Sequence, residues 1–399
     1  MMGKPKIRFK GYNEDWEQRK LGETKTFFTD GNYGEAYPKS SDMVDSSIGV
    51  PFLTGGNLKD GKLDISGASY ISKEKHELLT SGHLICDDIV IAVRGSLGAL
   101  GYVNSDNSGW NINSQLAILR TDKEELNGKF LLQFLLSENG QKEFLRRQTG
   151  TALKQLPIGA IKDVDIPITS IDEQVKIGEY FATLDHLITL HQHKCDEMKR
   201  LKKYMLQKMF PQNGKKVPEI RFDGFTNGWE QRKLGEIATY RNGKAHEANQ
   251  LDVGTYELVN LNSISIDGGL KPSGKFIEDG SDTLQRNDLV MVLSDVGHGD
   301  LLGRVAIIPE NNRYVLNQRV ALLRINDDTN TYFLFSIINR YQDYFKKLGA
   351  GSSQLNISRG IVENFEVAYP NVAEQRMIAD YFQSLDHLIT LHQHKCDEL

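Results

Sequence analysis

Two glycine-rich segments combine a flexible backbone with side chains that can form hydrogen bonds to nucleotide bases. RGSLGALG begins at Arg94, and SDVGHGDLLGRV begins at Ser294. Glycine lets the backbone approach a ligand closely, an arginine can bond guanine through two N–H groups, and an aspartate can accept a hydrogen bond from cytosine N4. These residue types fit contacts to double-stranded DNA, with a plain hairpin turn as the alternative. The candidate contact residues are Arg94, Gly95, Ser96, Ser294, Asp295, His298 and Arg304.

Two other segments place basic residues ahead of the short loops GTALKQ and GSSQLN. Residues 141–157 and 337–359 each hold four basic residues against one acidic residue, which gives each a local charge of +3. Such groups suit phosphate oxygens, although solvated helix faces show the same composition. The candidates for phosphate contact are Thr151, Lys154, Ser352, Ser353 and Asn356. A last set can either read bases or hold turns: Asn113, Gln115, Asn317 and Arg319.

Three other chemically suggestive patterns favour a structural interpretation. His191, His193 and Cys195 resemble metal ligands, but residues four apart share a helix face and His193 would point away from the other two. No metal site is expected. Instead, His191 and His392 are expected to form a buried polar layer that fixes the register of the two helices. Gly297 and Gly299 imitate a dinucleotide fingerprint only weakly, so no nucleotide cofactor is expected. The two tryptophans of the repeated segments, Trp16 and Trp229, are expected in the core.

An internal repeat organises the elements that must position these residues. PKIRFKGYNEDWEQRKLGE at 5–23 matches PEIRFDGFTNGWEQRKLGE at 218–236 in 13 of 19 positions, and LDHLITLHQHKCDE occurs unchanged at 184–197 and 385–398. Between them, DIVI pairs with DLVM and NSQLAILR with NQRVALLR, at offsets that vary along the chain. A varying offset indicates insertions in loops on a common frame. Each half reads as a strand-rich platform followed by one or two helices, and the chain is therefore of the α+β class.

The repeated fourteen residues belong to a long helix in each half. Apolar and polar seam positions recur in steps of three and four residues, as in a coiled coil. The first helix should run for about 39 residues to Pro211, or ~58 Å at 1.5 Å per residue, and should pair with the second. Residues 198–210 have no equivalent in the second copy, and we expect them to pack on another subunit. The expected interface residues are Phe181, Leu184, Ile188, His191 and Cys195, with Phe382, Leu385, Ile389, His392 and Cys396.

Composition limits the class of protein. The chain has 399 residues, 39% of them hydrophobic, and a formal charge of −5, which argues against a uniformly basic coat for nucleic acid. Three cysteines in a chain of this length fit a reducing compartment better than a disulfide framework, so the cytoplasm is expected. No signal peptide or membrane-spanning run is expected either, since the longest apolar runs are far below ~18 residues.

The order of these motifs resembles the specificity subunit of type I restriction-modification systems over nearly the whole chain. The resemblance rests on the two WEQRKLGE segments, the two glycine-rich segments, and the Glu-Gln pairs at 173–174 and 374–375 followed by LDxLIxLHQxK. It implies two similar target recognition domains joined by two long antiparallel helices, with an internal pseudo-twofold repeat. The implied boundaries are 1–170, 171–212, 213–370 and 371–399. The second helix is shorter than the family pattern.

The resemblance also implies a function and partners. Each domain would read one half of a bipartite DNA site, while the helices would set the spacer and dock two adenine methyltransferase subunits. Two motor-nuclease subunits would complete the assembly. The chain itself would be non-catalytic and hold no cofactor, with S-adenosylmethionine, ATP and Mg²⁺ bound only by partner subunits. Repeated docking surfaces fit two identical partners on physical grounds as well.

Two rival classes remain to be weighed. A self-sufficient methyltransferase would need an Asn/Asp-Pro-Pro-aromatic stretch, and the chain contains neither Pro-Pro nor a Walker-type GxxxxGK[ST] segment. A coiled-coil adaptor that does not read DNA would keep the helices but would have no need of two domains with divergent loops. The sequence therefore favours the specificity subunit, with the adaptor as the alternative.

Overall fold

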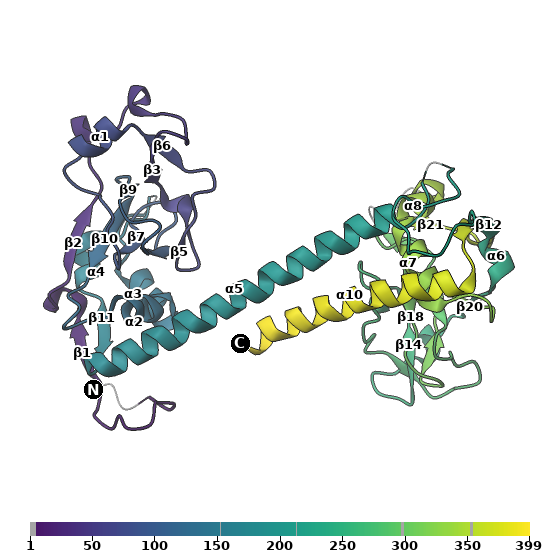
Figure 1. Ribbon diagram of the computed structural model, residues 1–399. Helices are drawn as coiled ribbons and strands as arrows, with labels where there is room; N and C mark the ends of the chain where they lie inside the picture. The colour runs from purple at the N-terminus through teal and green to yellow at the C-terminus, as the bar shows by residue number, and fades with distance from the viewer. Residues whose placement is uncertain (1–4, 152, 213, 297–298, 352–353) are drawn as a thin grey trace. The chain divides into compact units, whose positions relative to one another are not determined.

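The chain folds into two compact units, each described here by itself. Figure 1 shows the computed structural model, which describes residues 5–151, 153–212, 214–296, 299–351 and 354–399. The first unit ends at Leu187 and the second begins at Ile188, so the division falls inside the long helix α5 (Ile171–Lys208).

The first unit is rich in short strands and small helices. Its elements are β1 (Glu17–Lys20), β2 (Phe27–Asp30), β3 (Val50–Leu53), β4 (Leu58–Lys59), β5 (Lys62–Leu63), β6 (Ser69–Ile71), α1 (Lys73–Leu78), β7 (Ile89–Ala92), β8 (Leu100–Tyr102), β9 (Asn111–Ile112), β10 (Leu116–Arg120), α2 (Gly128–Leu136), α3 (Glu138–Arg147), α4 (Ile158–Lys162), β11 (Asp165–Ile168) and the first part of α5.

The second unit repeats this order with different loops. After the rest of α5 come β12 (Glu230–Lys233), α6 (Leu234–Ile237), β13 (Ala238–Asn242), β14 (Tyr256–Val259), β15 (Phe276–Ile277), β16 (Leu289–Val292), β17 (Ser294–Val296), β18 (Val305–Ile307), β19 (Tyr314–Leu316), β20 (Val320–Ile325), α7 (Thr331–Arg340), α8 (Gln342–Leu348), β21 (Gln354–Asn356), α9 (Arg359–Glu363), β22 (Glu366–Tyr369) and α10 (Val372–Glu398).

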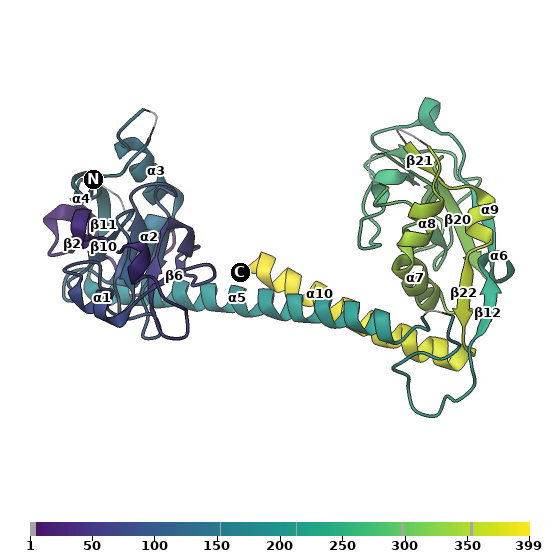
Figure 2. The same ribbon diagram turned by 90° about the horizontal axis from the view of Figure 1, so that it is seen from above.

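Each unit is built around a four-stranded antiparallel sheet. The strand order is β2-β10-β7-β8 in the first unit and β13-β20-β16-β18 in the second. Helices α2 and α3 cover one face in the first unit, and α7 and α8 cover the equivalent face in the second (Figure 2). A smaller three-stranded sheet, β6-β3-β9 or β15-β14-β19, lies beyond the other face. These mixed elements confirm the α+β fold class and the internal repeat.

The continuous apolar run DIVIAV is explained by burial on both faces of the sheet. Ile89 and Ile91 point to the helices, whereas Val90 and Ala92 point to the opposite core. Side chains alternate along a strand, so a strand covered on both faces must be apolar throughout. Burying each of these larger side chains contributes ~1.5–3 kcal/mol, and β16 shows the same alternation in the second unit.

An ion pair with a buried aspartate joins neighbouring strands in each unit. Arg120 on β10 donates to Asp88, just before β7, at 2.7 and 2.8 Å, and Arg324 donates to Asp288 at 2.8 and 2.7 Å. Both aspartates are buried. The arginine that ends NSQLAILR and NQRVALLR and the aspartate that begins DIVI and DLVM are therefore repeated because they hold the sheet together.

A second repeated clasp ties the start of each unit to its long helix. Glu173 on α5 accepts from Arg8 Nε and Nη2 at 2.5 and 2.7 Å and from Trp16 Nε1 at 3.3 Å. Although burial raises the pKa of Glu173, the hydrogen bonds from Arg8, Thr169 and Trp16 outweigh it, and the pKa lies below the ordinary value. All three residues of the clasp lie in motifs that recur in the sequence.

The equivalent clasp of the second unit has nearly the same geometry. Glu374 on α10 accepts from Arg221 Nε and Nη2 at 2.7 and 2.8 Å and from Trp229 Nε1 at 3.2 Å. Trp229 is in the core as expected, with 2% of its surface exposed, but Trp16 is only half-buried.

The glutamine of each Glu-Gln pair anchors a neighbouring helix. The Gln174 amide oxygen accepts from the backbone N–H of Asn127, the N-cap of α2, at 2.9 Å, and the Gln375 oxygen accepts equivalently from Asn330 before α7 at 2.9 Å. Both glutamines are fully buried. The pair therefore has a structural role: its glutamate holds the start of the unit and its glutamine holds the next helix.

In the second unit, residues 188–208 of α5 pair antiparallel with α10. Cys396 Sγ lies 3.7 Å from the carbonyl of Ile188, His191 and His392 bond through their Nδ1 atoms at 3.0 Å, and Lys202 bonds Asp386 at 2.6 Å. In successive contacts the residue number rises along α5 and falls along α10, so the two helices are antiparallel. The two helices lie side by side in both views (Figures 1 and 2).

The expectation that residues 198–210 pack on another subunit is wrong. Met209 and Phe210 are 2% and 1% exposed and belong to the core of the second unit, where Phe210 stacks on Phe382 with ring centroids 5.9 Å apart. Because the helices are antiparallel, this end of α5 meets the beginning of α10. Residues 198–210 therefore have a packing partner within the second unit, although they have no second copy in the sequence.

The seam residues differ in burial between the two copies. In the second unit, where α5 pairs with α10, the seam buries Cys195, Leu385 and Ile389. Phe181 and Leu184 belong to the first unit. Phe181 is 43% exposed, whereas its repeat equivalent Phe382 is fully buried. Within the described residues, no helix is long and apolar enough to span a membrane.

Candidate nucleic-acid interface

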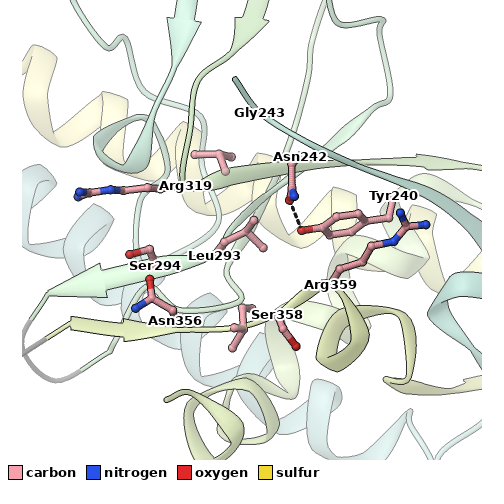
Figure 3. Close-up of a pocket in the computed structure, with 11 residues that line it drawn as sticks. Tyr240, Asn242, Gly243, Leu293, Ser294, Arg319, Asn356, Ser358 and Arg359 are labelled. Carbon is pink, nitrogen blue, oxygen red and sulfur yellow. Dashed lines mark hydrogen bonds between the residues drawn. The ribbon is translucent and has the colours of Figure 1, made fainter. Parts of the chain in front are cut away.

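A shallow depression at one end of the second unit gathers polar side chains from strands β13, β17 and β21, from helix α9 and from the turn before β20. Its volume is about 340 Å³ (Figure 3). It lies where β13, β16 and β20 meet the short sheet formed by β17 and β21. The lining residues are Tyr240, Asn242, Gly243, Leu293, Ser294, Arg319, Val320, Asn356, Ile357, Ser358 and Arg359.

Backbone hydrogen bonds fix the relative positions of the strand ends. Leu293 N–H donates to the carbonyl of Arg319 at 2.9 Å, and Ile357 N–H donates to the carbonyl of Leu293 at 2.9 Å. Ser294 pairs with Asn356 in the register of β17 and β21. Three segments far apart in sequence are therefore held side by side. Their residues Ser294, Arg319 and Asn356 lie together at one edge.

Arg319 is exposed and has an unusual backbone conformation. Its φ is +69°, in the left-handed region that non-glycine residues seldom adopt. Such a conformation persists only where the surrounding structure enforces it, and it is common at ligand sites. In Figure 3 its guanidinium extends away from the sheet at one side of the depression.

Arg359 and Tyr240 form the other side of the depression. The Arg359 guanidinium lies 5.5 Å from the centroid of the Tyr240 ring, and its Nε bonds Glu363 at 2.8 Å. The Tyr240 hydroxyl donates to Asn242 at 2.5 Å, and burial raises the pKa of Tyr240 to about 12. The tyrosine is therefore a neutral hydrogen-bonding group at physiological pH, close to a positive charge.

The first unit has an equivalent edge with different side chains. Val93 N–H donates to the carbonyl of Gln115 at 2.9 Å, and Leu156 N–H donates to the carbonyl of Val93 at 3.0 Å, the same pattern as in the second unit. By these bonds Arg94, Gln115 and Gln155 occupy the positions of Ser294, Arg319 and Asn356. The arginine of the first unit, Arg94, thus follows the middle one of the three segments. The arginine of the second unit, Arg319, lies in the neighbouring turn before β20.

Arg94 is held in place by an aromatic ring and an amide. Its Nε donates to Gln155 Oε1 at 3.3 Å, and its guanidinium lies 5.7 Å from the centroid of the Tyr33 ring. The Tyr33 hydroxyl donates to the carbonyl of Ser114 at 3.0 Å. Arg94 is exposed, as are Gly95 and Ser96 after it, so this edge presents an oriented, solvent-facing guanidinium.

The side chains of two expected base-reading residues form hydrogen bonds within their own turns instead. Asn113 and Asn317 are 4% and 6% exposed, and their side-chain oxygens accept from the backbone N–H groups of Gln115 and Gln318 at 3.0 and 2.9 Å. This is the turn-holding alternative given above. Their role as base contacts remains a prediction that this geometry does not favour, whereas Gln115 and Arg319, which follow them, are exposed.

Other expected residues of the second unit also face the protein. Ser294 and Asp295 are 3% and 8% exposed, and Asp295 Oδ2 accepts from Leu301 N–H at 2.9 Å. Arg304 Nη1 donates to the carbonyl of Asn339 at 3.1 Å, and burial lowers its pKa. Ser294 still lines the depression, but Asp295 and Arg304 lie outside its lining. His298 lies outside the described residues.

Three of the expected phosphate-binding residues are described by the structure and lie next to these edges. Thr151 and Lys154 are exposed near the backbone hydrogen bonds that join Thr149 to Gln155, and Asn356 is exposed where its backbone bonds that of Ala350. Ser352 and Ser353 lie outside the described residues. Part of the nearby positive charge is neutralised, since Glu143 binds Arg146 at 2.8 Å and also Arg147.

Sequence reasoning missed three members of the two edges. Tyr33, Gln155 and Tyr240 were not among the candidates, and Arg359 was counted only within a basic stretch. Gln155 could have been found, because GTALKQ and GSSQLN align it with Asn356. The two tyrosines gave no signal, since their positions depend on strand pairings between distant segments.

The His-rich segment of α5 does not assemble a metal site within the described residues. His191 bonds His392 across the helix pair, and His193 is exposed. No group of three or more His, Cys, Asp or Glu side chains is placed to hold a metal ion anywhere in the part of the chain that the structure describes.

Comparison with known proteins supports one family over both halves of the chain. The model of the type I restriction modification DNA specificity domain matches residues 13–200 and again residues 226–399. The putative type I restriction enzyme MjaX specificity subunit of Methanocaldococcus jannaschii is 21% identical over 401 residues, covering 97% of this chain and 90% of that protein. The type I restriction enzyme EcoBI specificity subunit of Escherichia coli is 25% identical over 203 residues, covering 49% and 41%.

A solved structure supports the fold. The S subunit of the type-I restriction-modification system from M. genitalium matches with a TM-score of 0.68 at 15% identity, covering 99% of this chain and 95% of that chain. The family match spans most of the chain and coincides with the repeated sheets, clasps and helices described above. The chain therefore belongs to the type I restriction modification DNA specificity family and carries two copies of its specificity domain.

Proposed function

We propose that this chain is the non-catalytic, DNA-reading subunit of a cytoplasmic type I restriction-modification assembly. Each unit reads one half of a bipartite double-stranded site through the edge formed by its strand ends. One observation carries the proposal: equivalent backbone bonds present Arg94, Gln115 and Gln155 in one unit and Ser294, Arg319 and Asn356 in the other. A common frame with different donors and acceptors at its edge is what two different half-sites require.

The repeated helix segment supplies the docking surfaces for partners. Packing explains why the inward residues of LDHLITLHQHKCDE are alike, but it does not explain the identity of the outward ones. His186, His193 and Asp196 are exposed, and so are their equivalents His387, His394 and Asp397. Identical exposed faces fit two identical partners, which we assign as adenine methyltransferase subunits that bind S-adenosylmethionine. Two motor-nuclease subunits that use ATP and Mg²⁺ complete the assembly.

Selection from random DNA duplexes tests the reading function. The chain is mixed with the duplex pool with and without its methyltransferase partner, and bound duplexes are sequenced after a gel shift. We expect two short fixed elements separated by a spacer of constant length and variable sequence. Recovery of DNA with no fixed element, in both arms, would leave only the adaptor function.

The long helix sets the spacer in this proposal, because α5 continues without a break from Ile171 to Lys208. Inserting one heptad after Leu187 adds ~10.5 Å of helix and should lengthen the preferred spacer by about three base pairs. Seven residues inserted beside the exposed Gly214, outside the helix, are the matched control. An unchanged spacer in the helix variant, read from methylated sites, would count against this role.

A further inference from the structure

The first unit carries an apolar groove that the proposed function does not use. It has a volume of about 430 Å³ and lies between the N-terminal segment, helix α2 and the first turns of α5. Aromatic and aliphatic side chains dominate its lining, which consists of Trp16, Phe130, Gln133, Phe134, Leu136, Ser137, Pro167, Ile177 and Phe181.

The second unit shows the same set of positions with an occupant. The repeat aligns Trp16, Phe130 and Phe181 with Trp229, Phe333 and Phe382. Phe210, just past the end of α5, contacts all three of these equivalent rings, at centroid distances of 6.1, 5.8 and 5.9 Å. Met209 lies in the same core. The carbonyl of Pro211 accepts from the Tyr341 hydroxyl at 3.0 Å, which fixes the end of the segment.

Burial differs between the two sets in the way an occupant would produce. Trp229 is 2% exposed and Phe382 is fully buried, whereas Trp16 is half-buried and Phe181 is 43% exposed. The aromatic pair beneath the groove is already formed, since the Trp16 and Phe130 rings lie edge to face at 5.8 Å. The groove is thus built before anything enters it, and an exposed aromatic patch of this kind marks an interaction surface.

The charge beside the groove also matches that of the occupant. In the second unit Lys202, two turns before the end of α5, bonds Asp386 at 2.6 and 2.8 Å. Asp185 is the equivalent acid of the first unit, one turn after Phe181, and it accepts from Gln133 Nε2 at 2.7 Å. Residues 198–211 carry five basic residues and no acidic one. A helix of that composition would bring its positive charge to Asp185.

We propose that this groove binds the C-terminal end of a basic amphipathic helix that finishes in adjacent Met, Phe and Pro residues, as Met198–Pro211 does in the second unit. The phenylalanine enters between Trp16, Phe130 and Phe181, and a lysine two turns earlier faces Asp185. The surface is separate from the DNA-reading edge and does not depend on it. It makes the first unit a receptor for a helix end, whereas the second unit contains its own.

A labelled peptide of residues 198–211 tests the proposal on the full chain. Fluorescence anisotropy should show saturable binding. A peptide with Phe210→Ala should bind the unaltered chain at least about tenfold more weakly, because a central aromatic anchor carries much of such an interface. In the protein, Phe181→Asp should weaken the parent peptide to a similar degree. Leu78→Asp, at a leucine of α1 that is 74% exposed and outside the groove, is the matched control and should bind as the unaltered chain does.

Three results would overturn the proposal. These are no binding of the parent peptide, equal binding of the Phe210→Ala peptide, and equal binding by the Phe181→Asp protein. The last would mean that the peptide enters the second unit in place of residues 198–211. Unchanged circular dichroism of Phe181→Asp keeps its loss of binding separate from misfolding, and the Phe210→Ala peptide tests the same contact without altering the protein.

Discussion

The two proposed reading edges differ in their side chains, although equivalent hydrogen bonds build the frame of each. In both units an ion pair between an arginine and a buried aspartate joins the central strands, and the same backbone bonds fix the strand ends. Yet the arginine that can bond guanine stands at 94 in one unit and at 319, on the neighbouring turn, in the other. In the proposed function exposed donors read the bases, so these positions can change while the buried frame is kept.

The two copies of the helix segment teach the opposite lesson. Fourteen residues are identical, but Leu385 and Ile389 are buried whereas Leu184 and Ile188 are only half-buried. Identical sequence gives identical local structure, and the environment then decides what is buried.

The largest effect is expected from the clasp of the second unit. Glu374 is 1% exposed and accepts two bonds from Arg221 and one from Trp229. Glu374→Ala leaves the largely shielded Arg221 guanidinium without its partner, and breaking a buried ion pair in this way typically costs about 3–5 kcal/mol. Hydrogen exchange of the β12 and β22 backbone, measured by mass spectrometry, should show the loss in the second unit.

Glu173→Ala is the matched variant and makes the test symmetrical. Its clasp is the same, with both partners similarly shielded. We expect a comparable loss confined to β1 and β11. Loss of protection in both units from either single variant would contradict their independence.

The next effect concerns the glycine beneath each reading turn. A Cβ on Gly243 would lie 1.8 Å from the carbonyl oxygen of Asn317, and one on Gly31 would lie 2.4 Å from that of Asn113. Gly243→Ala must therefore move the turn that carries Arg319, at about 3 kcal/mol, the upper end for overpacking. Thermal unfolding measures the loss, and selection of DNA should show relaxed specificity in one half-site only.

Gly159→Ala provides the control for a glycine-to-alanine change. A Cβ at this position, in helix α4, would meet no atom within 4 Å among the described residues outside its chain neighbours and its own helix backbone. This variant should be as stable as the unaltered chain or slightly more stable, because alanine favours helix. Equal behaviour of the two variants would show that the turn tolerates displacement.

Much of this frame follows from sequence, for identifiable reasons. The repeat located the strand-rich part of each unit, the continuous apolar run DIVIAV fits a strand covered on both faces, and the spacing of three and four indicated the helices. The partner of residues 198–210 was predicted wrongly, because the lack of a second copy does not imply the lack of a partner within the chain: in an antiparallel pair this end of α5 meets the beginning of α10. The burial of Asn113, Asp295 and Arg304 was likewise hidden, since polar residues are alike in sequence whether they hold a turn or face a ligand.

Removing the reading arginines sharpens the comparison of the two edges. Arg94→Ala and Arg319→Ala should each lower discrimination at one base pair by about 1–3 kcal/mol, the range for a bidentate contact. The two variants should affect different half-sites. Competition between duplexes altered at single positions measures this, at fixed salt because phosphate contacts depend on it.

A matched control separates base reading from general charge. Lys142 is exposed on α3 in an ion pair with Glu138, so Lys142→Ala should leave the preference among bases unchanged. If Arg94→Ala and Arg319→Ala weaken all duplexes equally, both arginines contact phosphate, and the exchanged position of the arginine has no bearing on specificity.

The smallest effect should come from the histidine pair between the helices. His191 and His392 bond through Nδ1 atoms, which requires at least one neutral ring to accept. Burial and the nearby His191, Lys395 and Lys194 lower the pKa of His392. In the unfolded chain His392 has a pKa near 6.5. The unfolded chain therefore takes up this proton more readily than the folded one, and stability declines as pH falls below about 6.5.

His392→Gln should lose less thermal stability than the unaltered chain between pH 7.5 and 5.5, whereas the variant at the exposed His193, His193→Gln, should follow the unaltered chain. Parallel losses in all three would mean that the pair between the two helix copies does not sense pH.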